Sequence, residues 1–168
     1  CCKSFKVSIE HGCWIEGSSG EKVWISKIGR IVDWKSQAVP EGVAVYFPGG
    51  GKLLVQEVEI DGEILEKVRS GRFSHDNGVY LSLKAKQRLF VEVRIRQPGD
   101  AYQPMGRESV VQLKELFIDR KIPRGERRTN PIITATDGEI LWVPGLPPSK
   151  NYLLTEIATR ALQLTYEK

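Results

Sequence analysis

The sequence predicts an α+β fold that is β-rich and mostly antiparallel, with one clear helix packed on the sheet. Short apolar runs alternate with polar residues through much of the chain, a pattern typical of half-buried strands. Turns that contain glycine separate several of these runs, as they do in β-hairpins. One segment differs, because residues at about 110–120 have the apolar spacing of an amphipathic helix.

The size and composition of the chain fit a globular protein with one core, or with one core and a lobe. The chain has 168 residues, of which 40% are hydrophobic. No apolar run is long enough to cross a membrane, and no signal peptide is recognisable. Because the chain does not begin with Met, we expect it to be a fragment of a longer polypeptide.

Three cysteines close to the N-terminus, Cys1, Cys2 and Cys13, do not make a disulfide framework. They indicate a reducing, cytoplasmic environment. With His11 they would supply four zinc ligands, but adjacent cysteines fit the paired spacing of zinc sites poorly. We therefore expect free or buried thiols and no metal site.

The first part of the chain reads as three strands joined by turns. Strands are expected at residues 4–10, 13–17 and 21–34, the last with a bend at Gly29. Turns are expected at 18–20 and 39–42. Three aromatic residues spaced ten apart would fill a small core: Trp14, Trp24 and Trp34.

A hairpin is expected within residues 42–65, where residues 48–51 separate two alternating runs. The glycines before Lys52 suggest a phosphate-binding loop, but Leu53 stands where that motif needs Ser or Thr, and a strand follows instead of a helix. The polar segment around His75 is expected to be a surface loop.

Further strands are expected at residues 79–83 and 88–96. In the second, Arg94 and Arg96 lie on one face, opposite the apolar face that carries Val93, and are roughly 7 Å apart. Arginines buried without partners would cost several kcal/mol. We therefore expect the apolar face to meet the core and both arginines to face solvent or a ligand.

A structural turn at Gly99 and Asp100 leads to the expected helix. Ser109 is suited to cap the helix, with Gln112 at the spacing of a capping box. Pro123 prevents the helix from continuing. The helix is therefore expected at about 110–120, with a broad apolar face.

The positive charge of the chain is concentrated around this unit. Residues 94–128 contain nine Lys or Arg and five Asp or Glu, an excess of four that equals the net charge of the whole chain. Such a local basic surface is typical of proteins that bind a polyanion. The alternative is that Arg94 or Arg96 pairs with Asp100 or Asp119 and holds the turn. The candidate binding residues are Arg94, Arg96, Arg107, Lys114, Lys121, Arg124, Arg127 and Arg128.

The C-terminal segment begins with a hairpin at residues 131–145 that turns at Asp137-Gly138. Residues 155–162 could form a short helix, or a turn that leads into a strand at 161–166. We favour the strand.

Three segments in series carry a resemblance to a known family. They read "RIRQPGDAYQPMG", "LKELFIDRKIPRGERRTNPII" and "DGEILWVPGL". In order and spacing, residues 94–155 resemble the C-terminal domain of bacterial tRNA(Ile)-lysidine synthetase. Residues 1–168 would then be a single tRNA-binding domain of a longer enzyme, with a β-rich lobe of less specific resemblance at 1–88 and the family-like region at 89–168.

The resemblance implies a function in tRNA modification. Such enzymes use ATP to convert the cytidine of a CAU anticodon in an isoleucine tRNA to lysidine, and the ATP, Mg²⁺ and catalytic residues belong to a separate N-terminal domain. The C-terminal domain binds the tRNA near its acceptor stem. This chain is thus expected to hold no catalytic residue and no cofactor, and to have the tRNA and that catalytic domain as partners.

Some positions depart from the family pattern, each with the loss of positive charge: Ala101, Val111, Gln112 and Pro147. The region also offers a single candidate for an exposed aromatic residue, Tyr102. Duplex RNA is recognised largely through its shape and backbone, whereas single strands are recognised by stacking on aromatic residues. The sequence therefore favours a duplex.

Two alternatives remain open. The chain could be a module that docks on a catalytic domain or a synthetase subunit without contacting RNA, and it could form a homodimer. A freestanding enzyme is disfavoured because no nucleophile motif, metal-ligand pair or nucleotide fingerprint is present.

Overall fold

The computed structural model describes residues 4–9, 13–18, 22–27, 36–47, 51–70, 77–83, 88–155 and 157–168. The chain divides into two compact units, Cys1–Trp34 and Lys35–Lys168. The first unit is an antiparallel sheet with strand order β1-β2-β3, formed by Ser4–Ile9, Cys13–Ser18 and Lys22–Lys27. The expected strands at 4–10 and 13–17 are confirmed.

Several expectations for the N-terminal segment fall outside the described residues. These are the zinc ligands proposed among Cys1, Cys2 and His11, the bend at Gly29 and the loop around His75. The same holds for the side chains of Cys13, Trp14, Trp24 and Trp34.

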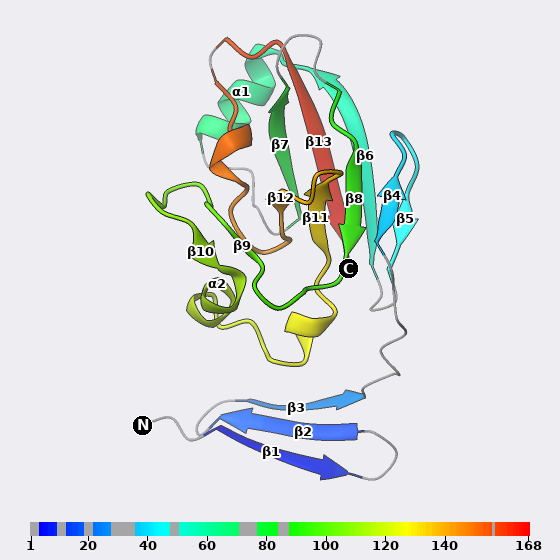
Figure 1. Ribbon diagram of the computed structural model, residues 1–168, viewed down its shortest axis with the longest axis vertical. Coiled ribbons are helices and arrows are strands. Elements are labelled where there is room, and N and C mark those ends of the chain that lie inside the picture. Colours follow the sequence, from blue (N-terminus) through cyan, green and yellow to red (C-terminus); the bar gives the residue numbers. More distant parts are fainter. Residues whose placement is uncertain are drawn as a thin grey trace. The chain divides into compact units, whose positions relative to one another are not determined.

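The second unit contains two four-stranded sheets and a two-stranded ribbon, all antiparallel (Figure 1). The first sheet has the order β12-β11-β8-β4, from Ile140–Trp142, Ile132–Ala135, Val91–Arg94 and Gln37–Val39. The second has the order β5-β6-β13-β7, from Val45–Tyr46, Lys52–Glu59, Arg160–Glu167 and Gly78–Leu83. The predicted α+β class is confirmed.

The last strand, β13, joins the two halves of the sequence. It lies between β6 and β7 and pairs with both along most of its length. The strand favoured for residues 161–166 is thus confirmed. β13 therefore completes a sheet whose other three strands all lie before residue 88.

The hairpins form where turn residues predicted them. β11 pairs with β12 across a turn in which Gly138 has φ +89°, and β5 pairs with β6. Gly42, in the expected turn at 39–42, has φ +74°. These positive φ values lie in the region that glycine adopts without strain.

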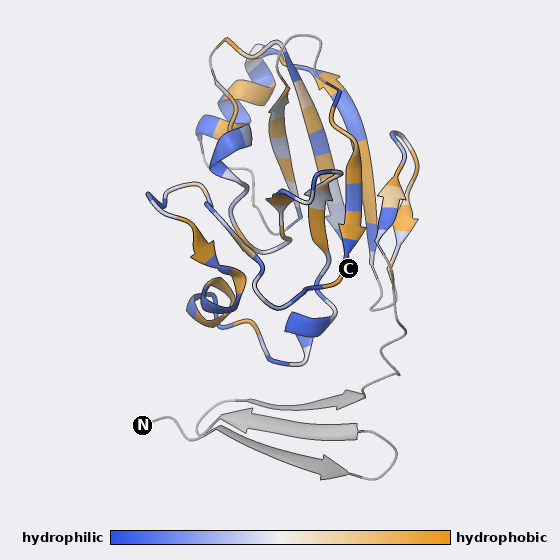
Figure 2. Ribbon diagram, in the orientation of Figure 1, coloured by the Kyte–Doolittle hydropathy of each residue, from blue (hydrophilic) through white to orange (hydrophobic). Residues whose placement is uncertain are grey.

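The structure also contains a helix, α1 (Gly62–Arg69), that the sequence did not predict. The side chain of Asp61 caps it by accepting a hydrogen bond of 2.8 Å from the backbone N–H of Ile64. None of its residues is buried, and Figure 2 shows hydrophilic residues along much of it. Its few apolar residues are Ile64, Leu65 and Val68, and the first two continue the alternating run that precedes them, so residues 60–65 looked like the continuation of a strand.

The predicted helix is shorter than expected at its N-terminal end. α2 spans Leu113–Asp119, and the preceding Val111–Gln112 form strand β10, which pairs with β9 (Ala101–Tyr102). Ser109 does not cap the helix, because Gln112 occupies the cap position and makes no side-chain cap bond. The backbone N–H of Leu113 donates instead to the carbonyl of Asp100 at 2.8 Å. Pairing between distant strands therefore prevailed over the local capping signal.

α2 covers a hydrophobic cluster beside the first sheet. The cluster is formed by Tyr102, Leu113, Leu116, Phe117, Ile132, Ile140, Val143 and Leu146. The apolar face of α2 is narrower than predicted, since Val110 and Ile118 are 65% and 50% exposed. The described residues of the unit also form the short 3-10 helices η2 (Glu126–Arg128) and η3 (Lys150–Tyr152). Among the described residues, no helix is long and apolar enough to span a membrane.

Candidate nucleic-acid interface

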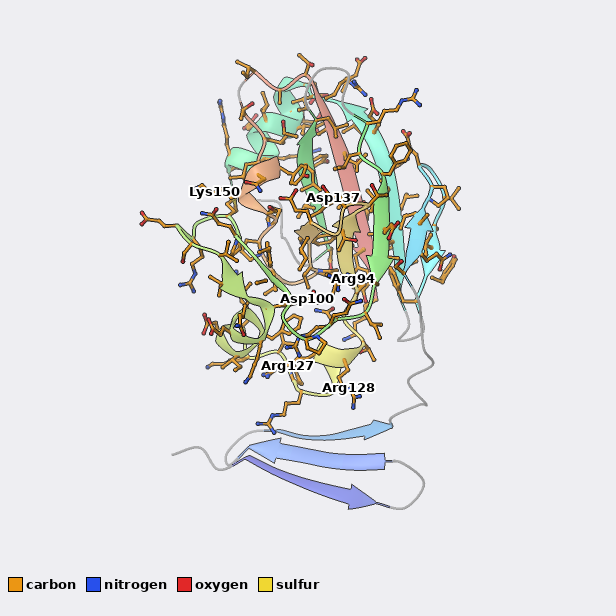
Figure 3. The ribbon with its side chains drawn as sticks, viewed as in Figure 1. Arg94, Asp100, Arg127, Arg128, Asp137 and Lys150 are labelled. Atoms are coloured by element: carbon orange, nitrogen blue, oxygen red, sulfur yellow. The ribbon has the colours of Figure 1, made fainter. Side chains whose placement is uncertain are left out.

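The turn after β8 is held by a buried ion pair. The Arg94 guanidinium donates two hydrogen bonds to the Asp100 carboxylate, Nη1 to Oδ2 at 2.9 Å and Nη2 to Oδ1 at 2.8 Å. The backbone N–H of Gln97 donates to the same carboxylate at 2.7 Å. Gly99 makes the bend with φ +87°. The two charged side chains are 13% and 8% exposed, and they point toward one another in Figure 3.

This pair corrects the expectation that both arginines of the strand face solvent or a ligand. Arg94 lies opposite Ile132 on β11, and Ile132 belongs to the cluster under α2. β8 ends at Arg94, before the expected end of the strand at Arg96, and the face of β8 that carries Arg94 is also covered by protein. Arg94 is accommodated there because Asp100 supplies a bidentate partner, which offsets the loss of hydration.

Arg96 differs from Arg94 because it has no such partner. It is partly buried, and its Nε atom is fully covered without a hydrogen-bond partner among the described residues. Covered polar groups in proteins are nearly always hydrogen-bonded. The unpaired Nε is thus an unusual feature of the site.

A second arginine is anchored in the loop that leaves α2. Nε of Arg127 donates to the carbonyl of Ile122 at 2.7 Å. The backbone amides of Glu126 and Arg127 both donate to the carbonyl of Pro123, which forms η2. Lys121 turns the chain with φ +54°, a value that is uncommon for a residue other than glycine. The loop is therefore tied to the end of the helix.

The other predicted cations are exposed. Arg107 contacts Asp119 at 3.2 Å, and both side chains are 56% exposed, so this pair is worth little. The remaining four are exposed as well, on α2, the following loop and η2: Lys114, Lys121, Arg124 and Arg128. Figure 1 places α2 and η2 at the same end of the second unit, away from α1. Apart from Arg96, the predicted residues thus divide into anchored arginines within the fold and exposed cations at its surface.

Tyr102 is not the exposed aromatic residue that the sequence suggested. It is 5% exposed, and its hydroxyl donates to the carbonyl of Pro147 at 2.7 Å. Burial raises the pKa of the Tyr102 hydroxyl well above its ordinary value near 10. The side chain therefore packs in the core and offers no stacking surface for a base.

Two further cations, absent from the predicted set, lie near this end of the unit. Arg120 is exposed at the end of α2. Lys168 contacts Glu126 of η2 at 3.1 Å, which brings the C-terminal residue beside the arginines of that helix. The contact between Lys168 and Glu126 could not be expected from the sequence, because the two residues lie far apart along the chain. Within the described ranges, no three His, Cys, Asp or Glu side chains gather as a metal site would require.

Comparison with known proteins identifies the family. Residues 91–163 match the model of the TilS substrate C-terminal domain. A tRNA(Ile)-lysidine synthase from Bacillus subtilis is 39% identical over 75 residues, which are 45% of this chain and 16% of that protein. One from Clostridium perfringens is 30% identical over 120 residues, 67% of this chain and 25% of that protein.

Residues 91–163 belong to this domain family. The predicted resemblance is therefore confirmed. A crystal structure of a TilS C-terminal domain superposes with a TM-score of 0.64 and 29% identity, and the match covers 79% of this chain and 97% of that one. The TilS-like fold thus extends well beyond the region that the sequence resemblance marks. This chain matches a quarter or less of the length of the two synthases.

Proposed function

We propose that this chain is the tRNA-recognition domain of a tRNA(Ile)-lysidine synthase. The proposal rests on one observation: in this TilS-like domain some of the basic residues are bonded to protein groups and others are exposed. Arg94 and Arg127 are bonded to protein groups, whereas the cations on α2, its loop and η2 remain exposed. Anchored arginines fix the surface, and the exposed cations attract phosphates.

The exposed cations fit the backbone of duplex RNA near the acceptor stem. Phosphate contacts position a nucleic acid and need Lys or Arg, whereas single-strand binding needs exposed aromatic residues. Tyr102 is buried, so the basic region lacks its expected stacking residue. Arg94 and Arg127 are therefore assigned to positioning. The phosphate contacts are the partly buried Arg96 and the exposed Arg107, Lys114, Lys121, Arg124 and Arg128.

The modification of an isoleucine tRNA with a CAU anticodon would take place outside this chain. ATP, Mg²⁺ and lysine would bind to a catalytic domain in the part of the protein that corresponds to the unmatched length of the relatives. No step of that reaction is assigned to the residues described here. The partners in this proposal are the tRNA and the catalytic domain, in the cytoplasm.

A second candidate function is docking on a protein partner. It is favoured by Val110 and Ile118, which are exposed next to the cations of α2. Such a contact would bury apolar surface and depend weakly on salt. This property separates it from RNA binding.

The test is the binding of the 168-residue chain to isoleucine tRNA with a CAU anticodon and to an unrelated tRNA, measured across a salt series. Each neutralised phosphate contributes roughly 0.7–0.9 to the slope of log K against log salt. We expect a slope of about −2 or steeper, and Lys114→Ala and Arg128→Ala should each flatten it by nearly one such increment.

Lys67→Ala is the matched control, because Lys67 is an exposed lysine on α1, at the other end of the unit in Figure 1. It should leave the slope unchanged. If the parent chain does not bind, or binds with a flat slope that none of the substitutions alters, RNA recognition is excluded and the docking function takes its place. A preference for isoleucine tRNA would locate specificity in this domain.

A further inference from the structure

The state of Arg96 in the free chain points to a specific role in binding. Its Nε is covered and unpaired among the described residues, although the side chain is charged and only partly buried. A donor in this state has lost its hydration without gaining a hydrogen bond, which is unfavourable. Arg94, two residues earlier, avoids this cost through Asp100, and Arg127 avoids it through the carbonyl of Ile122.

Three carboxylates in this region already accept hydrogen bonds from other cations. Both Asp100 oxygens accept from Arg94, and Asp119 accepts from Arg107. Glu126 accepts from Lys168. The carboxylates that the sequence offered as partners for Arg96, Asp100 and Asp119, are thus occupied by other cations.

We infer that Arg96 donates two hydrogen bonds, from Nε and one Nη, to a single phosphate group of the RNA. Binding thereby gives the covered Nε the acceptor that it lacks in the free chain. The inference rests on the proposed function and deepens it. Because Nε is covered in the free chain, binding through it requires the side chain to change rotamer, and such changes are common at interfaces. The planar guanidinium matches two phosphate oxygens, which an ammonium group does not.

Two consequences distinguish Arg96 from an exposed arginine. Substitution by lysine keeps the charge but removes Nε and the fork, so affinity should fall while the salt slope stays the same. Substitution by methionine removes the unpaired donor and keeps an unbranched stem, so the thermal midpoint should not fall.

The binding experiment compares Arg96→Lys with Arg128→Lys in the 168-residue chain, using the same tRNA as above. Arg96→Lys should weaken binding about tenfold or more, as expected for the loss of a charge-assisted hydrogen bond. Arg128→Lys, at an exposed position, should change it by less than about threefold. Equal affinities for the parent and Arg96→Lys would overturn the inference.

The Nε–Hε groups provide a direct readout by NMR, with a short RNA hairpin and, separately, inorganic phosphate as probes. Arg96→Lys identifies the Arg96 signal by its disappearance. That signal should move downfield when the hairpin is added, whereas the Nε signal of Arg127, already bonded to Ile122, should move little. An unmoved Arg96 signal in the bound state, or a thermal midpoint lowered by Arg96→Met, would show that the guanidinium serves the fold and not the ligand.

Failure of the inference and failure of the proposed function give different results. If the parent binds tRNA with a steep salt slope but Arg96→Lys binds equally well, only the role of Arg96 is refuted. If the parent binds no tRNA, both are refuted.

Discussion

The ion pair between Arg94 and Asp100 allows a quantitative prediction. Asp100→Ala would remove three hydrogen bonds to the carboxylate, two from Arg94 and one from the backbone of Gln97. It would also leave the Arg94 guanidinium, 13% exposed, without its partner. Removing one member of a buried pair costs about 3–5 kcal/mol. We expect a loss in this range from the free energy of unfolding of the second unit.

The measurement is urea and thermal unfolding of the parent and of Asp100→Ala, followed by circular dichroism. The shift of the thermal midpoint per kcal/mol depends on domain size, and the second unit lies between the two size classes for which it is known. For this size, a loss of 1 kcal/mol lowers the midpoint by roughly 3–5 °C. The midpoint should therefore fall by roughly 9–25 °C. Asp119→Ala is the matched control: it breaks the Arg107 pair, whose side chains are both 56% exposed, and should cost at most about 1 kcal/mol.

A double substitution distinguishes the cost of losing the ion pair from the cost of leaving Arg94 charged without its partner. Arg94→Met with Asp100→Leu removes both charges and should recover most of the stability lost in Asp100→Ala, because an apolar replacement of a buried pair is often neutral. If Asp100→Ala costs no more than Asp119→Ala, the carboxylate does not hold the turn and the reasoning fails.

Three further predictions concern other parts of the second unit. Tyr102→Phe should cost about 0.5–1.5 kcal/mol, since it leaves the Pro147 carbonyl without its hydrogen bond. Because burial raises the folded-state pKa of Tyr102, the contribution of its hydroxyl to stability is complete below the ordinary value near 10 and is lost as pH rises above it. The decline of stability at alkaline pH should therefore be shallower in the variant than in the parent. Identical slopes in a urea series over pH would contradict this. Gly51→Ala should destabilise by about 1–3 kcal/mol, because the new Cβ would lie 2.8 Å from the Tyr166 hydroxyl and the residue has φ +122°. In the control Gly42→Ala the new Cβ meets nothing within 4 Å, so only the strain of φ +74° remains. Equal thermal midpoints for the two variants would refute the steric explanation. Asp61→Ala removes the cap of α1 and should raise amide exchange there with little change in the global midpoint, since no α1 residue is buried; unchanged exchange would show that the cap is dispensable.

The sequence by itself determined much of this protein. The Asp137-Gly138 turn between two apolar runs located the two strands of the hairpin at residues 131–145, and the final strand was favoured at 161–166. The positions of glycine predicted the turns at Gly99 and Gly138, where φ is positive. The motifs in series identified the family, and the charge of residues 94–128 located the candidate interface.

The tertiary structure alone decided how the residues of that interface are used. Arg94, Arg96 and Arg128 look alike in the sequence, but Arg94 faces Asp100 and a covered sheet, whereas Arg128 is exposed. Likewise, Ser109 had the sequence of a helix cap, but pairing of β10 with β9 started the helix at Leu113. Local patterns report what a segment favours in isolation, whereas the partner of a charged group and the register of a short strand depend on residues that only folding brings together. The sequence therefore located the basic region, and the fold assigned its members to anchoring or to the exposed surface.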